Sequence, residues 1–245
     1  MGSGESAILT YHSLDTSGSV LSTDPRAFQR QMEWLAESGI PVVPLSAAPR
    51  TPGSVALTFD DGFRSFLSDA LPLLEKYNLP ATLFVVSGYC GRSNRWPGQS
   101  PRVPEFELLD WTELREVSAR GISLGAHTVN HPRLPALSDA EAEAELGDSK
   151  AAIEDRVGTS VDAFAYPYGV SSPAIRGLVR RRFRVGCGTR LQLAGDSDPY
   201  DLPRVDVYYL RRQFWFERLM TGGGRRYLRA RRLLRDARAC LFPSL

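Results

Sequence analysis

The chain has 245 residues, of which 42% are hydrophobic and 24% charged, and its formal net charge is +2. These values are those of a globular protein with one sizeable core, so we expect a single domain. No run approaches the roughly 18 apolar residues of a membrane span, which excludes a spanning helix. Three widely separated cysteines without C-x-x-C spacing argue against a thiolate metal cluster. They favour a reducing compartment, and with no basic and apolar leader visible we expect a cytoplasmic protein.

Short apolar runs alternate along the chain with segments of helical period, the pattern of βα units on a parallel sheet. Strands are predicted at Ala7–Tyr11, Val55–Phe59, Ala81–Val86, Ser123–His127, Ala163–Pro167, Arg184–Thr189 and Arg204–Tyr209, with a short piece at Val42–Val43. Helices are predicted over 25–38, 66–77, 111–120, 138–157, 173–182, 211–220 and near 225–240. Asp24-Pro25 and Ser138-Asp139 are typical helix starts, and Gly39 and Gly121 stand where helices should stop.

Polar residues follow several of these predicted strands at the point where each strand ends. They are His12, Asp60, Asp61, His127, Tyr168 and Asp206. In a barrel of parallel strands the carboxyl ends meet at one rim, where the chemistry gathers. We therefore expect these side chains to converge. The long segment Ser87–Glu107, rich in glycine, proline and serine, could add Trp96 to a sugar site or could be a surface loop.

Two adjacent carboxylates, Asp60 and Asp61, follow the strand that begins at Val55. Like charges at such a place repel and resist desolvation, and a bound cation would relieve both costs. One carboxylate could bind the metal while the other moves protons. A turn with a helix cap is the competing interpretation.

Two histidines four residues apart, His127 and His131, follow another predicted strand, and the chain holds only three histidines. With Asp61 they form the ligand set of a catalytic zinc site, which leaves positions open for water and substrate. A metal at such a site lowers the pKa of its water and polarises a carbonyl oxygen. A hydrolase also needs a base and an acid, and Asp60 and His12 are the residues available for these roles.

Together these motifs resemble those of the NodB-homology polysaccharide deacetylases, carbohydrate esterase family four. The motifs are TFDDG at 58–62 and HTVNH at 127–131, and FAYPYG at 164–169 is a less specific match to a third family motif. The resemblance extends from Ala7 to about Tyr209 and implies a single-domain, distorted (β/α)7 TIM-like barrel. It implies Asp60 as catalytic base and Asp61, His127 and His131 as ligands of a divalent metal, usually Zn²⁺. It also implies that the backbone N–H of Tyr168 stabilises the oxyanion.

Three features of the sequence depart from the family pattern. Ala165 stands where the family commonly has an arginine, no histidine follows His131, and the Asp-rich fourth motif is reduced to LPRVD at 202–206. These changes resemble the PgaB and IcaB subgroup, in which a Tyr-His near the N-terminus supplies the acid, as Tyr11-His12 would here. We predict that Arg204 replaces the missing arginine beside Asp60 and that Asp206 orients His12.

Residues 211–245 hold ten arginines against two acidic residues, a local charge of +8, while the rest of the chain carries −6. We divide the chain into a barrel over 1–210 and an Arg-rich helical extension over 211–245, packed on the barrel or projecting from it. A basic amphipathic helix suits an anionic membrane surface or a phosphate group, so a membrane-peripheral location is a second expectation. A solvated helix packed on the barrel is the alternative, and no nucleic-acid motif is present.

The predicted function is removal of an N-acetyl group from an N-acetylhexosamine-containing polymer, lipid-linked sugar or small glycoside, with release of acetate. Two alternatives stay open: hydrolysis of a non-sugar amide by the same machinery, and an inactive carbohydrate-binding barrel. The sequence identifies neither the glycan, nor the metal, nor the oligomeric state.

Overall fold

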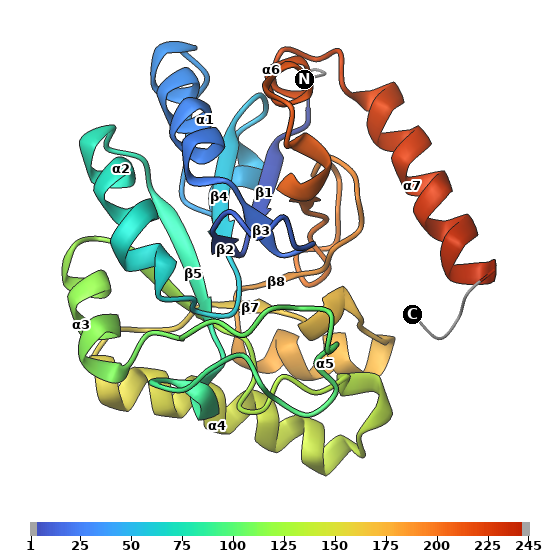
Figure 1. The fold of residues 1–245 in the computed structure, drawn as a ribbon. Helices are drawn as coiled ribbons and strands as arrows, with labels where there is room; N and C mark the ends of the chain where they lie inside the picture. Colours follow the sequence, from blue (N-terminus) through green and yellow to red (C-terminus); the bar gives the residue numbers. More distant parts are fainter. Residues whose placement is uncertain (1–3, 242–245) are drawn as a thin grey trace.

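Seven parallel strands form one curled sheet in the order β8-β7-β6-β5-β4-β1-β9 (Figure 1). The structure is a computed structural model that describes residues 4–241. The strands are β1 (Ala7–Tyr11), β4 (Val55–Phe59), β5 (Ala81–Val85), β6 (Ser123–Ala126), β7 (Ala163–Ala165), β8 (Val185–Cys187) and β9 (Val205–Asp206). The curled sheet and its surrounding helices are the (β/α)7 barrel predicted from the sequence.

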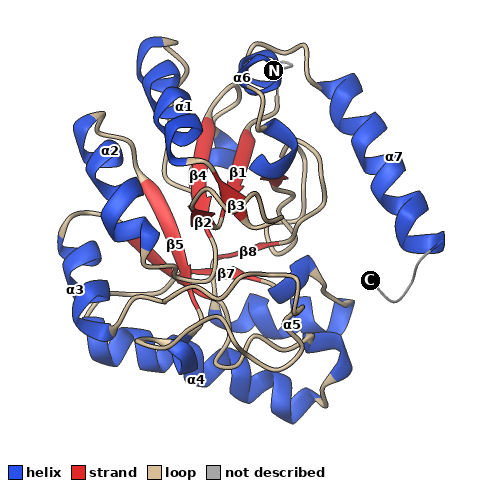
Figure 2. Ribbon diagram, in the orientation of Figure 1, coloured by secondary structure: helices blue, strands red, loops and turns tan. Residues whose placement is uncertain are grey.

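Helices surround this sheet, as Figure 2 shows with helices in blue and strands in red. They are α1 (Pro25–Glu37), α2 (Leu71–Lys76), α3 (Trp111–Ala119), α4 (Asp139–Val157), α5 (Pro173–Arg182), α6 (Gln213–Met220) and α7 (Arg225–Leu241). Each predicted helix is present. No helix among the described residues is long and apolar enough to cross a membrane.

Local sequence explains where these elements begin and end. The central strands β1, β4 and β5 are buried along their whole length, as expected when helices cover a parallel sheet. Asp24 caps α1 by accepting backbone N–H groups, and Ser138 and Glu141 form a reciprocal capping box on α4. Gly39 and Gly121 take positive φ angles of 70° and 88° after α1 and α3, as the stop signals predicted.

The structure differs from the predicted elements at four places. The strand predicted over Arg204–Tyr209 is only β9, because the chain turns at once into a 3₁₀-helix at Val207–Leu210. The helix predicted over 66–77 begins with a π-turn at Phe66–Ala70 before α2. Val42 forms an isolated bridge to Val55 instead of a strand. A second, two-stranded sheet of β2 (Ser13–Leu14) and β3 (Ser22–Thr23) was not predicted.

The sheet has two open edges, β8 and β9. The chain segment that connects these two strands, residues 188–204, bridges the gap between the edges. Gly188 donates its backbone N–H to the Leu202 carbonyl at 2.9 Å, and Cys187 pairs with Leu202. Helix α7 lies against this segment, where Arg232 donates to the Gln192 side chain at 2.9 Å. Arg235 donates to the Thr189 carbonyl at 2.8 Å. The extension is thus anchored on the side of the barrel where the sheet is open (Figure 1).

Candidate active site

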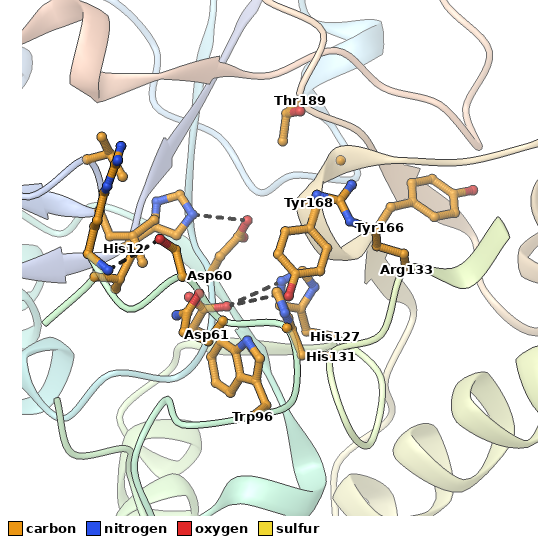
Figure 3. A pocket seen from close by; sticks show the side chains of 18 of the residues that line it. His12, Asp60, Asp61, Trp96, His127, His131, Arg133, Tyr166, Tyr168 and Thr189 are labelled. Carbon is orange, nitrogen blue, oxygen red and sulfur yellow. Dashed lines mark hydrogen bonds and ion pairs between the residues drawn. The ribbon is translucent and has the colours of Figure 1, made fainter. Parts of the chain in front are cut away.

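Polar side chains from several strand ends line one cavity at the carboxyl ends of the strands. This cavity has a volume of about 720 Å³. Six of the predicted residues line it: His12, Asp60, Asp61, His127, His131 and Tyr168. Arg204 lies behind Asp60 and is 1% exposed, and Asp206 does not line the cavity. Figure 3 shows how the lining side chains face one another.

Asp61, His127 and His131 form a compact group of potential metal ligands. Their ligand atoms all lie within 4.8 Å of one another, and all three residues are buried. Asp61 Oδ1 lies 3.4 Å from His127 Nε2 and 3.5 Å from His131 Nε2. Figure 3 shows the three side chains pointing toward one another. One carboxylate oxygen and two imidazole nitrogens fit a divalent metal that keeps open positions for water or substrate.

The surroundings of His127 prepare its Nε2 as a ligand. Its Nδ1 lies 2.7 Å from the carbonyl oxygen of Ala165 and donates its proton there, so Nε2 is the nitrogen that faces Asp61 and is available to a metal. Burial acts to lower the pKa of His127, but Asp61 and Asp60 outweigh it and raise this pKa above its ordinary value. The β7 backbone thereby sets the tautomer that metal binding requires.

His131 has a different electrostatic setting. Burial lowers its pKa to about 3, so without a metal this imidazole is neutral at physiological pH and needs no deprotonation to act as a ligand. Trp96 packs on it with ring centroids 4.5 Å apart, and Tyr168 contacts it at 4.6 Å. His131 is therefore held between two aromatic side chains.

The backbone of the ligand loops adopts left-handed conformations at residues other than glycine. Asp61, Thr128 and His131 have φ angles of 73°, 69° and 56°. Such angles cost free energy, and they concentrate at functional sites, where the surrounding structure maintains them. Here Thr128 Oγ1 accepts the backbone N–H of His131 at 2.9 Å, and Ser149 donates to the Thr128 carbonyl at 3.0 Å.

Asp60 is engaged by a buried arginine. Arg204 donates from its two terminal nitrogens to the two carboxylate oxygens, at 2.7 Å each. Burial acts to raise the pKa of Asp60, but Arg204, together with His127 and His12, holds it at about 2. The carboxylate is thus ionised at every physiological pH and can accept a proton. The predicted contact between Arg204 and Asp60 is present.

His12 follows β1 and faces Asp60 across the cavity, with Nε2 3.9 Å from Asp60 Oδ2. Burial raises the pKa of Asp206, and the nearby His12 lowers it by a smaller amount. The carboxylate oxygen Oδ1 of Asp206 accepts the backbone N–H of Tyr208 at 2.8 Å. No hydrogen bond between Asp206 and His12 is present among the described residues, so the orienting role of Asp206 stays a prediction.

Tyr168 lies in the turn after β7 and also has a positive φ, 58°. The next residue, Gly169, is in contact with Thr189, another residue of the cavity wall. Arg133 stacks over the Tyr168 ring at 4.5 Å. Sequence reasoning did not find Arg133, although it stands two residues after the ligand motif. Trp96 was proposed from the sequence as a residue of a sugar site, and it lines the cavity at only 3% exposure and contacts His131.

Similarity to known proteins identifies the family to which this site belongs. The model of the family described as polysaccharide deacetylase matches residues 47–182. The chain belongs to the polysaccharide deacetylase family. The matched segment contains Asp60, Asp61 and both ligand histidines, whereas His12 and Arg204 lie outside it.

Two relatives align with much of this chain. YxkH of Bacillus subtilis is 27% identical over 210 residues, which are 82% of this chain and 70% of that protein. The poly-β-1,6-N-acetyl-D-glucosamine N-deacetylase of Staphylococcus aureus is 25% identical over 163 residues, which are 62% of this chain and 53% of that protein. The alignment with the staphylococcal enzyme thus spans about half of that protein.

Solved structures of deacetylases share the fold. IcaB from Ammonifex degensii superposes with a TM-score of 0.75 at 25% identity, covering 91% of this chain and 98% of that one. The Streptococcus pyogenes deacetylase PplD, solved in complex with acetate, gives a TM-score of 0.72 at 24% identity and covers 84% and 93%. These similarities support the curled barrel described above.

Proposed function

We propose that this member of the polysaccharide deacetylase family is a metal-dependent enzyme that hydrolyses the N-acetyl group of an N-acetylhexosamine-containing glycan and releases acetate. The observation that carries the proposal is the Asp61, His127 and His131 group beside an ionised Asp60 and within one cavity with His12. A divalent ion held by the three ligands, most simply Zn²⁺, would supply an activated water and polarise the acetyl carbonyl.

The chain's own residues divide the remaining steps. Asp60 accepts a proton from the attacking water, and Arg204 keeps the carboxylate ionised and fixes its two oxygens. The backbone N–H of Tyr168 donates to the acetyl oxygen as that oxygen gains charge. His12, on the other side of Asp60, gives a proton to the departing amine, which leaves as the free amino sugar.

The relatives suggest which substrate to test first. The staphylococcal relative is named for poly-β-1,6-N-acetyl-D-glucosamine, and IcaB from Ammonifex degensii shares the fold over nearly its whole length. Oligomers of β-1,6-linked N-acetylglucosamine are therefore the first choice. A lipid-linked sugar and a small N-acetylated glycoside are the next members of the panel.

The test is acetate release from this panel by the metal-loaded chain. We expect release that is lost on chelation, that returns with Zn²⁺, and that falls by about 10² to 10⁴ in His12→Ala and Asp60→Asn. Release from a non-sugar amide alone would move the assignment to a different C–N hydrolase. Sugar binding without any release, and without bound metal, would show an inactive carbohydrate-binding barrel.

A further inference from the structure

The C-terminal segment of α6 and α7 is the most basic part of the molecule. Between residues 211 and 235 the chain has nine arginines and a single acidic residue, Glu217. The catalytic chemistry described above uses none of these arginines. Their arrangement on α7 therefore calls for a role outside the reaction itself.

One face of α7 is fastened to the barrel. Leu228 is buried at 3% exposure, and Tyr227 stacks on Trp215 of α6 with ring centroids 4.1 Å apart. Arg232 and Arg235 donate hydrogen bonds to Gln192 and to the Thr189 carbonyl. These contacts fix which side of the helix faces away from the protein.

Away from these contacts, a second face of α7 combines exposed leucines with exposed arginines. Leu233 and Leu234 are 67% and 61% exposed, the highest values among the large hydrophobic side chains of the described residues. Arg226 and Arg229 are exposed and form no ion pair within the described part of the chain. At 100° per residue Leu233 projects between Arg226 and Arg229. Phe214 on the neighbouring helix α6 is 59% exposed.

We propose that this face of α7 binds the surface of an anionic lipid bilayer. Arginines attract anionic head groups, and the leucines between them can enter the boundary between head groups and acyl chains. Exposed leucines add nothing to binding of a nucleic-acid backbone, which depends on charge alone. Because α7 is too polar to span a bilayer, it would lie along the surface.

The inward contacts connect this surface to the catalytic cavity. Arg235 holds the carbonyl of Thr189, and the same Thr189 lines the cavity next to Gly169. A bilayer under α7 would therefore lie one helix and one short loop away from the catalytic wall. This inference does not depend on the proposed reaction, because it concerns the location of the protein.

The experiment measures sedimentation of the full chain with vesicles. The vesicles are phosphatidylcholine alone or an equimolar mixture of phosphatidylcholine and phosphatidylglycerol. We expect binding to the mixed vesicles only, weakened by salt, and reduced ~tenfold or more in Arg226→Glu/Arg229→Glu. Leu233→Ser/Leu234→Ser keeps the charge and should also weaken binding if the leucines enter the bilayer.

A matched control separates this face from net charge. Arg26 and Arg30 are exposed on α1, one turn apart, and form no ion pair among the described residues, so Arg26→Glu/Arg30→Glu makes the same change in charge elsewhere. Equal loss in both double variants, no binding by the unaltered chain, or equal binding to both vesicles would each overturn the proposal. Circular dichroism melting checks that the variants fold. Acetate release from a soluble substrate should be unchanged in the α7 variants. If neither the unaltered chain nor any variant released acetate, the result would count against the proposed reaction and not against membrane binding.

Discussion

Arg204 reaches from the start of β9 to Asp60 at the end of β4, 144 residues earlier in the chain, and donates a hydrogen bond to each carboxylate oxygen. The same guanidinium donates through Nε to the carbonyl of Gly188, just after β8, at 2.9 Å. Since β8 and β9 are the two open edges of the sheet, Arg204 links both edges to the proposed base. One side chain thus contributes to closing the barrel and to holding the catalytic carboxylate.

The first prediction concerns this buried ion pair. Arg204→Met leaves the Asp60 carboxylate buried without its partner, which should lower the free energy of unfolding by about 3 to 5 kcal/mol. The double variant Asp60→Asn/Arg204→Met removes both charges and should regain much of that loss without regaining activity. Urea unfolding of the single and double variants measures the coupling. A single variant as stable as the original chain would show that the pair does not support the fold.

The second prediction follows from the lowered pKa of Asp60. Its pKa of about 2 in the folded protein lies below the ordinary 3.8, so the ionised form stabilises the fold above about pH 4. This contribution, about 2 kcal/mol, should be lost as the pH falls from about 4 toward 2. Urea unfolding in the presence of a chelator should show a steeper acid limb for the original chain than for Asp60→Asn. Parallel limbs would contradict the shift.

The third prediction tests the metal ligands separately from the catalytic groups. Loss of a contact that only supports a ligand weakens metal binding ~10- to 100-fold. Asp61→Ala and His127→Ala remove ligands themselves, so each should weaken metal binding more than that. His12→Ala is the matched control, because it changes a histidine of the same cavity outside the ligand group and should keep its metal. Metal content after dialysis gives the stoichiometry. Zn²⁺ at 100 times its Kd should raise the stability of the control, but not of the ligand variants, by about 2.7 kcal/mol. Equal metal content in all variants would place the metal elsewhere.

The sequence was sufficient to predict much of the barrel and the centre of the site, for a physical reason. A buried parallel strand needs a continuous apolar run, and a polar residue at its carboxyl end marks both the end of the strand and the rim of the barrel. Asp61 after β4 and His127 after β6 were placed correctly on that basis. The resemblance to the family added the contact between Arg204 and Asp60, which no local pattern shows.

Other features depend on tertiary contacts that leave no local signal. The left-handed backbone at Asp61 and His131 could not be predicted, because neither is a glycine, the residue that usually signals such a conformation. The end of β9 was predicted too late, since Asp206 turns back to accept the Tyr208 N–H and starts a 3₁₀-helix. The side chain of Cys240 lies outside the described residues, whereas Cys90 and Cys187 are free.

The last prediction concerns the wall of the cavity opposite the ligands. Gly169 has a φ of +68°, and a Cβ added there would lie 1.9 Å from Thr189 Oγ1, closer than any real contact. Gly158 has a similar φ of +79° after α4 but meets nothing within 4 Å, so it serves as the control. Both Gly→Ala variants should lower the free energy of unfolding by ~1 kcal/mol, because alanine is strained at a positive φ. Only Gly169→Ala should also displace Thr189 and the turn of Tyr168, which lowers kcat more than it lowers stability. Equal effects of both variants on kcat would show that this contact does not shape the site.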